Sequence, residues 1–287
     1  MNYECAYIDI TGKLLEGKKG SYVCEAKIGN GGNGKIYKGR VIDSHGDIDM
    51  PSTVALKQIP ANKNSNEIYF AHLLSNTPIE GLAPVYEAFV QDNHCYVIMP
   101  FISGTRLSDT IDRFVPNTRN VSVSLPCIIV LQIAHTINHL HNNNIAHLDI
   151  KPSNILLTGI NRRPILIDYG TMRHIRNKKG TDTSIFASHV TDGYSAPELY
   201  DCNYSMAVQS DIFSLGALLY KLSTGKTPPC SCSDGFKTFK HSQFDSVPYI
   251  YRDVLNKSMA INAHHRYKDM TALIGDLAEC LEVTDHN

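Results

Sequence analysis

The stretch that most constrains this chain is the octet from His147 to Asn154, which reads His-Leu-Asp-Ile-Lys-Pro-Ser-Asn. A long apolar segment precedes the octet, and the short apolar run 155–157 follows it. Asp149 is followed by Lys151 two residues later and by Asn154 five residues later. A carboxylate, an amine and an amide this close together form either an ordinary polar loop or a site of chemistry. The other motifs of the chain decide between the two.

Length and composition place the chain among globular proteins. Its 287 residues suggest roughly two core-bearing units, and 43% hydrophobic residues argue against disorder. The net charge of −1 provides no general field that would attract nucleic acid or acidic lipid. No apolar run reaches the roughly 18 residues of a membrane span, and the first residues lack a signal-peptide pattern. We therefore expect a soluble cytoplasmic protein without nucleic-acid partners.

The eight cysteines are scattered along the chain and form no C-x-x-C pair. A zinc site or a disulfide framework is therefore not indicated. We expect reduced thiols that are mostly structural.

A glycine-rich motif lies near the N-terminus. Gly29, Gly31 and Gly34 fit G-x-G-x-x-G, and residues 35–41 then alternate like a strand. A dinucleotide site would need a helix after the motif. The strand-loop-strand context instead favours either a plain hairpin or a loop whose backbone N–H groups approach phosphate oxygens.

Further motifs follow in a fixed order. Val-Ala-Leu-Lys ends at Lys57, Asp-Tyr-Gly begins at Asp168, and Ala-Pro-Glu ends at Glu198. Together with the octet and the glycine-rich motif, they resemble the protein kinase family over about residues 22–281. Lys151 within the octet is typical of the serine/threonine branch of that family.

The resemblance implies an α+β fold with two lobes. The small lobe would be mainly antiparallel strands with one helix, the larger lobe would be mainly helical, and ATP would lie between them. We assign residues 21–101 to the small nucleotide-binding lobe and residues 102–287 to the large catalytic lobe. Residues 1–20 are either an extension or a first strand.

The resemblance also assigns catalytic roles. Asp149 would accept or orient the proton of the acceptor hydroxyl, and Lys151 would neutralise charge on the transferred phosphoryl group. Thr191 falls where the serine/threonine branch places a threonine that bridges these two side chains. Asn154 and Asp168 would hold Mg²⁺ or Mn²⁺.

A second group of residues would bind the nucleotide. Lys57 would contact the α and β phosphates of ATP and form an ion pair with Glu67, because a buried cation needs an anion. Met99 would line the adenine pocket, and backbone groups near residues 100–102 would hydrogen-bond adenine. The full set implied for the nucleotide comprises Ile28, Gly29, Gly31, Gly34, Ile36, Ala55, Lys57, Glu67, Met99, Phe101, Ile102 and Leu156.

The chain departs from the family pattern in three places. Leu148 replaces the arginine that normally pairs with a phosphorylated activation loop, and the helix that carries Glu67 has little room before it. Both features predict activity without activation-loop phosphorylation. Tyr169 replaces the usual phenylalanine and adds a hydroxyl that needs a partner or water.

Several structural expectations complete the prediction. Residues 79–101 read as two strands, residues 128–144 as a helix with solvated or core rather than metal-binding histidines, and residues 249–281 as two helices. Asp211 would begin a buried helix, and in the family this residue braces the catalytic loop. The resemblance also implies that Glu198 forms a structural ion pair with Arg266. The basic stretch 171–190 is either a solvated loop or a docking patch, and its candidate autophosphorylation sites are Thr181, Thr183, Ser184 and Ser188.

The predicted function is therefore a serine/threonine kinase that transfers the γ-phosphoryl group of ATP to protein substrates. The first alternative is a catalytically inactive kinase-like scaffold. The second is a small-molecule phosphotransferase of related fold. The sequence indicates neither the substrate nor the oligomeric state. It also leaves open whether the protein acts in its own cytoplasm or is delivered into another cell.

Overall fold

The computed structural model describes residues 8–31, 34–45, 50–60, 65–115, 122–177, 179–181, 190–200, 206–228 and 246–285. The candidate phosphorylation sites Thr183, Ser184 and Ser188 lie outside these residues, as do residues 32 and 33 of the glycine-rich motif.

The chain divides into two compact units. The first contains Met1–Ser103 together with Asp168–Gly170, and the second contains Gly104–Ile167 together with Thr171–Asn287. The three residues 168–170 therefore pack with the first unit, although their neighbours along the chain belong to the second.

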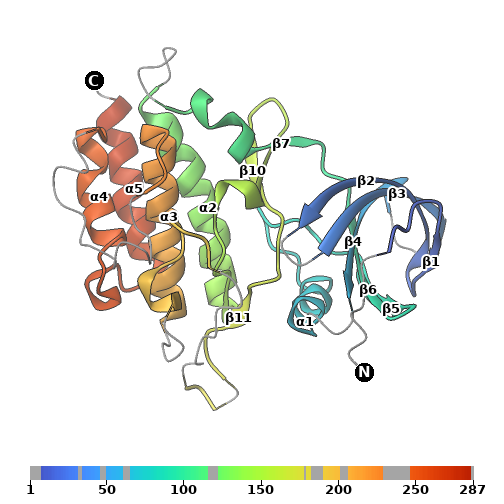
Figure 1. Cartoon of the computed structure of the whole chain (residues 1–287). Coiled ribbons are helices and arrows are strands. Elements are labelled where there is room, and N and C mark those ends of the chain that lie inside the picture. Colours follow the sequence, from blue (N-terminus) through green and yellow to red (C-terminus); the bar gives the residue numbers. More distant parts are fainter. Residues whose placement is uncertain are drawn as a thin grey trace. The chain divides into compact units, whose positions relative to one another are not determined.

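The first unit is an antiparallel six-stranded sheet with one helix (Figure 1). The strands follow the order β1-β2-β3-β4-β6-β5. Their bounds are Leu14–Glu16 for β1, Gly20–Gly31 for β2, Gly34–Ser44 for β3, Thr53–Pro60 for β4, Glu87–Gln91 for β5 and His94–Pro100 for β6. Helix α1, Ser65–Leu74, begins two residues before Glu67. This confirms the prediction that the helix has little room before Glu67.

One face of the sheet carries the core of the first unit. Aromatic and aliphatic side chains with a relative exposure of at most 1% pack there, namely Ile10, Leu15, Tyr22, Cys24, Tyr37, Val54, Leu56, Tyr96 and Ile98. Burial of such apolar surface is the main favourable contribution to folding. Ile10 and Leu15 belong to the described part of the N-terminal stretch, residues 8–20, so this part contributes to the core and supplies a first strand.

Side chains of the last strand, β5, bond the segment that contains β1. The Gln91 side-chain oxygen accepts from the Glu16 N–H at 2.9 Å, and the Glu87 carboxylate accepts from the Lys18 N–H at 2.9 Å. These bonds cover backbone groups that an open edge would expose to pairing with other chains.

The first of the two strands predicted within residues 79–101 is shorter than expected. Strand β5 begins at Glu87, and residues 79–86 form a loop whose last residue, Tyr86, donates to the Ile98 carbonyl at 2.8 Å. Pro84 has no N–H to contribute to a ladder, which explains why the strand starts later.

The second unit is mainly helical (Figure 1). Its α-helices are α2 over Ser124–Asn142, α3 over Ala207–Thr224, α4 over Arg252–Ser258 and α5 over Met270–Asp285. Its short strands are β7 over Gly104–Arg106, β8 over Ile145–Ala146, β9 over Ile155–Thr158, β10 over Arg163–Leu166 and β11 over Arg173–His174. Short 3-10 turns complete it, at Leu107–Arg113, Pro152–Asn154, Pro197–Tyr200, Tyr249–Tyr251 and Ala263–His265.

Helix α2 starts earlier than predicted because Pro126 is tolerated in its first turn. The helix ends at Asn142, and Asn144 adopts a left-handed conformation with φ of 62°. Asparagine tolerates this conformation better than most residues do.

Helix α3 is the buried helix that the sequence predicts. Fourteen of its residues are buried, and it ends at Gly225, whose φ of 72° is the left-handed conformation that favours glycine at this position. Among the described residues, no helix is both long and apolar enough to cross a bilayer.

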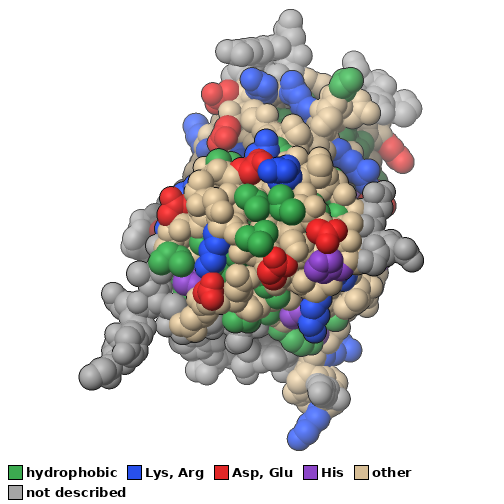
Figure 2. Space-filling view, turned by 90° about the vertical axis from the view of Figure 1, so that its right-hand side faces the viewer, with side chains coloured by type: hydrophobic (Ala, Val, Ile, Leu, Met, Phe, Trp, Pro, Cys, Tyr) green, Lys and Arg blue, Asp and Glu red, His purple; other side chains and the backbone are tan. Residues whose placement is uncertain are grey.

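The surface mixes charges of both signs. On the face shown in Figure 2, acidic and basic side chains are interspersed between hydrophobic ones. Ion pairs between exposed side chains such as Arg40 and Glu25 contribute little to stability.

A buried ion pair joins the segment after residue 195 to the turn before α5. Arg266 donates to both carboxylate oxygens of Glu198, at 2.7 and 2.9 Å, as the sequence predicts. The remaining donors of the guanidinium reach the carbonyl oxygens of Ala260, Gln209 and Ile261. Ser210 donates to the same carboxylate at 2.7 Å. Every charge in this cluster is therefore compensated.

We expect Arg266→Met to lower the free energy of unfolding by about 3–5 kcal/mol, because Glu198 would be left buried without its cation. Denaturant titration followed by circular dichroism measures the change. Lys268→Met is the control, since the Lys268 side chain is 84% exposed and 3.7 Å from Asp269. Equal effects of the two substitutions would contradict a structural role for the buried pair.

Candidate active site

The octet forms a loop between β8 and β9 in the second unit. Residues 152–154 make one 3-10 turn, and the Asn154 N–H donates to the Lys151 carbonyl at 3.0 Å. Leu148 has a φ of 65°, which is uncommon for a residue with a branched side chain. Its side chain is buried. Such strain persists only where the surroundings enforce it.

The carboxylate of Asp211 enforces the backbone of this loop. It accepts from the His147 N–H at 2.9 Å and from the Leu148 N–H at 2.7 Å, and it lies 2.8 Å from Nε2 of His141. The prediction that Asp211 begins its helix was wrong. Helix α3 starts at Ala207, and Asp211 bonds the amides of another segment rather than those of its own first turn.

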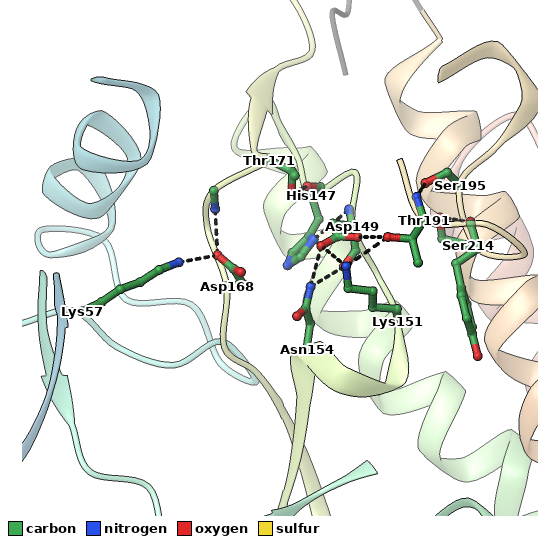
Figure 3. A network of polar contacts seen from close by, with 12 residues as sticks. Lys57, His147, Asp149, Lys151, Asn154, Asp168, Thr171, Thr191, Ser195 and Ser214 are labelled. Carbon is green, nitrogen blue, oxygen red and sulfur yellow. Dashed lines mark hydrogen bonds and ion pairs between the residues drawn. The ribbon is translucent and has the colours of Figure 1, made fainter. Parts of the chain in front are cut away.

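Three side chains surround the carboxylate of Asp149 (Figure 3). The amide nitrogen of Asn154 donates to its Oδ2 at 2.7 Å, and the amine of Lys151 lies 2.8 Å from the same oxygen. The hydroxyl of Thr191 donates to Oδ1 at 3.1 Å and accepts from Lys151 at 3.0 Å. The structure therefore brings together four of the predicted site residues, and both carboxylate oxygens are oriented.

Thr191 is itself held by the segment that follows it. Its N–H donates to the Ser195 hydroxyl at 2.8 Å, and the Ser195 N–H donates back to the Thr191 carbonyl at 2.8 Å. The Ser214 hydroxyl of α3 donates to the carbonyl of Tyr194 at 2.9 Å. The threonine is thus fixed to the helical core and not to a free loop.

In the first unit, Lys57 of β4 lies between two carboxylates. It forms the predicted ion pair with Glu67 of α1. Figure 3 shows the second pair, which Lys57 forms with Asp168 at 2.9 Å. Asp168 also accepts from the Gly170 N–H at 3.0 Å. Lys57 and Glu67 are both buried.

Burial favours the neutral form of both Lys57 and Glu67. Burial alone would lower the pKa of Lys57, but the carboxylates of Asp168 and Glu67 outweigh it and raise this pKa above its usual value. Burial raises the pKa of Glu67, and the neighbouring charge of Lys57 opposes that rise. Lys57 therefore remains a cation at neutral pH, which is the form that binds an anion.

Four residues predicted for the nucleotide share one face of the sheet. Ile36 is paired with Lys57, and Ala55 is paired with Met99. Directly opposed residues of antiparallel strands project to the same side, and so do residues two apart. Ile36, Ala55, Lys57 and Met99 thus line the same surface, and Gly29 pairs with Ile36 at its end.

The glycine-rich hairpin extends to the pair Gly31–Gly34. A Cβ atom on Gly34 would lie 2.4 Å from the Gln58 carbonyl oxygen, so this position requires glycine for the close approach of β3 to β4. Packing of the sheet is therefore a second reason for this glycine, besides any approach to phosphate.

Four further residues are assigned to the nucleotide, namely Ile28, Phe101, Ile102 and Leu156. Ile28 and Phe101 are exposed, Ile102 follows β6, and the ammonium of Lys38 lies 5.2 Å from the centre of the Phe101 ring. Leu156 belongs to the second unit, where it pairs with Arg106 of β7. For these four residues, as for the other residues assigned to the nucleotide, the role stays a prediction.

The resemblance implies two residues as ligands of a divalent ion, Asn154 of the second unit and Asp168, which packs with the first unit, and this role stays a prediction. No group of three or more histidine, cysteine or acidic side chains that could hold a metal occurs among the described residues. The amide nitrogen of Asn154 donates to Asp149, so its oxygen is the atom that remains as a ligand. An amide oxygen and the carboxylate of Asp168 suit Mg²⁺ or Mn²⁺, which take oxygen ligands and also use phosphate oxygens and water.

The sequence did not predict the contacts by which His141 and Thr171 support the catalytic loop. His141, predicted to be one of several solvated or core histidines, contacts Asp211, and the hydroxyl of Thr171 donates to the His147 carbonyl at 2.8 Å. The only signal for His141 was its position on the helix just before the octet. Thr171 had no signal beyond its proximity to Asp168.

We expect Asp211→Asn to lower the free energy of unfolding by about 2–3 kcal/mol, because an amide NH₂ would replace one acceptor that faces a backbone donor. Thermal and denaturant unfolding measure this change. Asp192→Asn is the control, since Asp192 is exposed and accepts from the Tyr200 hydroxyl at 2.9 Å. A stable Asp211→Asn protein with an unchanged loop would refute the bracing role.

Comparison with known proteins identifies relatives over much of the chain. It is 27% identical over 191 residues to the serine/threonine-protein kinase PknB of Mycobacterium tuberculosis, covering 63% of this chain and 30% of that protein. It is 28% identical over 222 residues to human serine/threonine-protein kinase ULK3, covering 74% and 43%. For PknL of Mycobacterium bovis the identity is 28% over 279 residues, covering 91% and 66%. The chain thus spans only part of the length of these relatives.

A solved structure confirms the predicted fold class. The crystal structure of the Mycobacterium tuberculosis PknI kinase domain superposes with a TM-score of 0.66 at 18% identity, covering 90% of this chain and 96% of that one. At this identity the similarity supports the fold alone.

The family model of the protein kinase domain matches residues 22–283, a range that contains the octet, Lys57, Asp168 and the Glu198–Arg266 pair. This chain therefore belongs to the protein kinase family.

Proposed function

We propose that this protein is a serine/threonine kinase that transfers the γ-phosphoryl group of ATP to hydroxyl groups of protein substrates. The observation that carries the proposal is the carboxylate of Asp149, oriented by Lys151, Asn154 and Thr191. A fixed carboxylate beside a cation is the arrangement needed to accept a hydroxyl proton while negative charge is neutralised.

Each side chain of this network has a distinct proposed role. Asp149 accepts or orients the proton of the acceptor hydroxyl. Lys151 already contacts Asp149 and Thr191, so its ammonium is positioned to neutralise charge on the transferred group. Thr191 holds Asp149 and Lys151 at a fixed separation. The two side chains therefore lose less entropy when they reach the reactive geometry.

Lys57 is the proposed anchor for the α and β phosphates. Its paired carboxylates keep it charged and restrict its motion, so it presents a preorganised cation. Ile36, Ala55 and Met99 on the same face would pack against the base, and backbone groups near residues 100–102 would hydrogen-bond it. Asn154 and Asp168 would hold Mg²⁺ or Mn²⁺, which neutralises phosphate charge when bound.

The acceptor is proposed to be serine or threonine on a protein. Lys151 and Thr191 are the pair typical of that branch, and the relatives PknB, ULK3 and PknL carry serine/threonine-protein kinase in their names. The segment around Ala196–Glu198, held by Arg266, argues against a small-molecule phosphotransferase. An inactive scaffold is not favoured either, because no group of the proposed machinery is missing from the sequence.

The proposed compartment is the cytoplasm, where ATP is available. Cys24, Cys95, Cys127 and Cys280 are free and buried, which suits a reducing environment. The cytoplasm of another cell would also provide ATP and a reducing environment, so delivery into another cell is compatible with the same proposal.

We expect Asp149→Asn to reduce phosphoryl transfer by roughly 10²- to 10⁴-fold, the usual contribution of a positioned base. Binding of a fluorescent ADP analogue should persist, because Asp149 is not among the proposed nucleotide residues. Radiolabelled ATP, the purified protein and a generic acceptor protein provide the assay, followed by phosphoamino-acid analysis.

The matched control is Asp253→Asn, an exposed position on α4, which should transfer phosphate at the wild-type rate. Wild-type activity of Asp149→Asn would contradict the assigned base. Phosphotyrosine as the main product would contradict the serine/threonine assignment, and a wild-type protein that binds nucleotide without transfer would favour the scaffold.

We also propose that activity does not require a phosphorylated activation segment. Leu148 offers an apolar, buried side chain where a cation would be needed to hold a phosphate. In the described part of that segment, Arg173 is half-buried and donates to the Met172 carbonyl at 2.7 Å. It is therefore the cation to test as a substitute.

Phosphatase-treated and untreated protein should transfer phosphate at the same initial rate, because the catalytic loop is braced by Asp211 without a phosphate. Mass spectrometry verifies that the phosphate has been removed before the rate is measured. A large loss of rate on treatment, reproduced by Arg173→Ala, would overturn the proposal.

A further inference from the structure

The tyrosine of the Asp-Tyr-Gly motif has a hydrogen bond that a phenylalanine could not make. The Tyr169 ring is buried at 1% relative exposure, and its hydroxyl donates to the carbonyl oxygen of Ala83. We call this hydrogen bond the tyrosine latch. Both residues belong to the first unit.

The acceptor of the latch is itself fixed. Ala83 is buried and lies in the loop between α1 and β5. Leu82 next to it donates to the Ile79 carbonyl at 3.1 Å, and Tyr86 donates to Ile98 of β6 at 2.8 Å. The carbonyl therefore has a defined position relative to the sheet that carries Lys57.

Solvent does not compete for this hydrogen bond. The Tyr169 ring and Ala83 are both buried, so the hydroxyl and the carbonyl oxygen face each other away from water.

The latch explains how residues 168–170 stay with the first unit. Their chain neighbours Ile167 and Thr171 belong to the second unit. The Asp168–Lys57 ion pair at 2.9 Å and the tyrosine latch are polar contacts that tie the tripeptide to the first unit. The ion pair uses the proposed metal ligand itself, whereas the latch is independent of metal and phosphate.

We infer that Tyr169 is a positioning residue, whose hydroxyl holds the backbone of the tripeptide so that the Asp168 carboxylate is oriented for a divalent ion. The inference rests on the proposed function, because it assigns Asp168 to the metal. A phenylalanine would fill the same space, yet it would leave the Ala83 carbonyl without this donor and remove the anchor that does not involve Asp168.

The test is Tyr169→Phe. The Mg²⁺ concentration that gives half-maximal binding of a fluorescent ADP analogue should rise roughly three- to tenfold, the equivalent of one lost hydrogen bond. Amide hydrogen exchange in a peptide covering residues 168–172 should become faster. The turnover number should fall, while the KM for the acceptor protein stays unchanged.

Tyr37→Phe is the matched control. Tyr37 is also fully buried in the first unit, and its hydroxyl donates to the Ile8 carbonyl at 3.3 Å. The substitution removes the same kind of bond away from the tripeptide. Thermal stability should therefore fall in both variants, whereas the Mg²⁺ requirement and the exchange of residues 168–172 should change only in Tyr169→Phe.

The two hypotheses fail in different ways. If Tyr169→Phe and Tyr37→Phe show the same Mg²⁺ requirement and the same exchange of residues 168–172, Tyr169 is only structural and the inference is overturned. If wild-type protein binds no Mg²⁺-nucleotide, the proposed function fails. In that case, the amide hydrogen exchange of residues 168–172 alone decides whether the tyrosine latch orders the tripeptide.

Discussion

The geometry of the catalytic loop depends on one buried carboxylate. Asp211 accepts two backbone N–H groups of the loop and contacts His141, and no solvent reaches it. An ionised group in such a place is stable only when hydrogen bonds replace its hydration. The same bonds hold Leu148 at a φ of 65°, a conformation that costs of order 1–3 kcal/mol. The carboxylate and the strained backbone therefore stabilise each other.

This arrangement explains how the loop accommodates Leu148 in place of the arginine of the family pattern. Asp211 binds main-chain amides, so the loop does not depend on the side chain at position 148. Leucine there keeps the backbone path and places its side chain in the core. Relative to the family pattern, the substitution removes a cation, and the consequence proposed for it is activity without a phosphorylated activation segment.

Short-range patterns carried most of the prediction. The octet, Lys57, Asp168 and their order along the chain carried the resemblance to protein kinases, which implied the two-lobed α+β fold and the Glu198–Arg266 ion pair. The Lys57–Glu67 pair was predicted because a buried cation needs an anion. The partners that sequence could not supply are those chosen by tertiary packing. Nothing in the spacing relates Tyr169 to Ala83, and the covering of β1 by Gln91 depends on the curvature of the sheet. The position of Asp211 within α3 was misjudged because its acceptor role suited a helix start equally well.

Exposure separates the charges that hold the fold from those proposed to react. The side chains of Arg266 and Glu198 are at most 4% exposed, so their ion pair is insulated from water and from salt. Lys57 and Glu67 are as deeply buried, so the proposed contact of Lys57 with phosphate requires its ammonium to become accessible. Asp149, Lys151 and Asp168 are 11%, 23% and 17% exposed. A group that must meet a substrate or an ion needs an open side, and it loses part of its electrostatic strength to solvent. The hydrogen bonds from Asn154 and Thr191 to Asp149, together with the Tyr169–Ala83 bond beside Asp168, offset that loss by fixing the orientation of groups that burial does not hold in place.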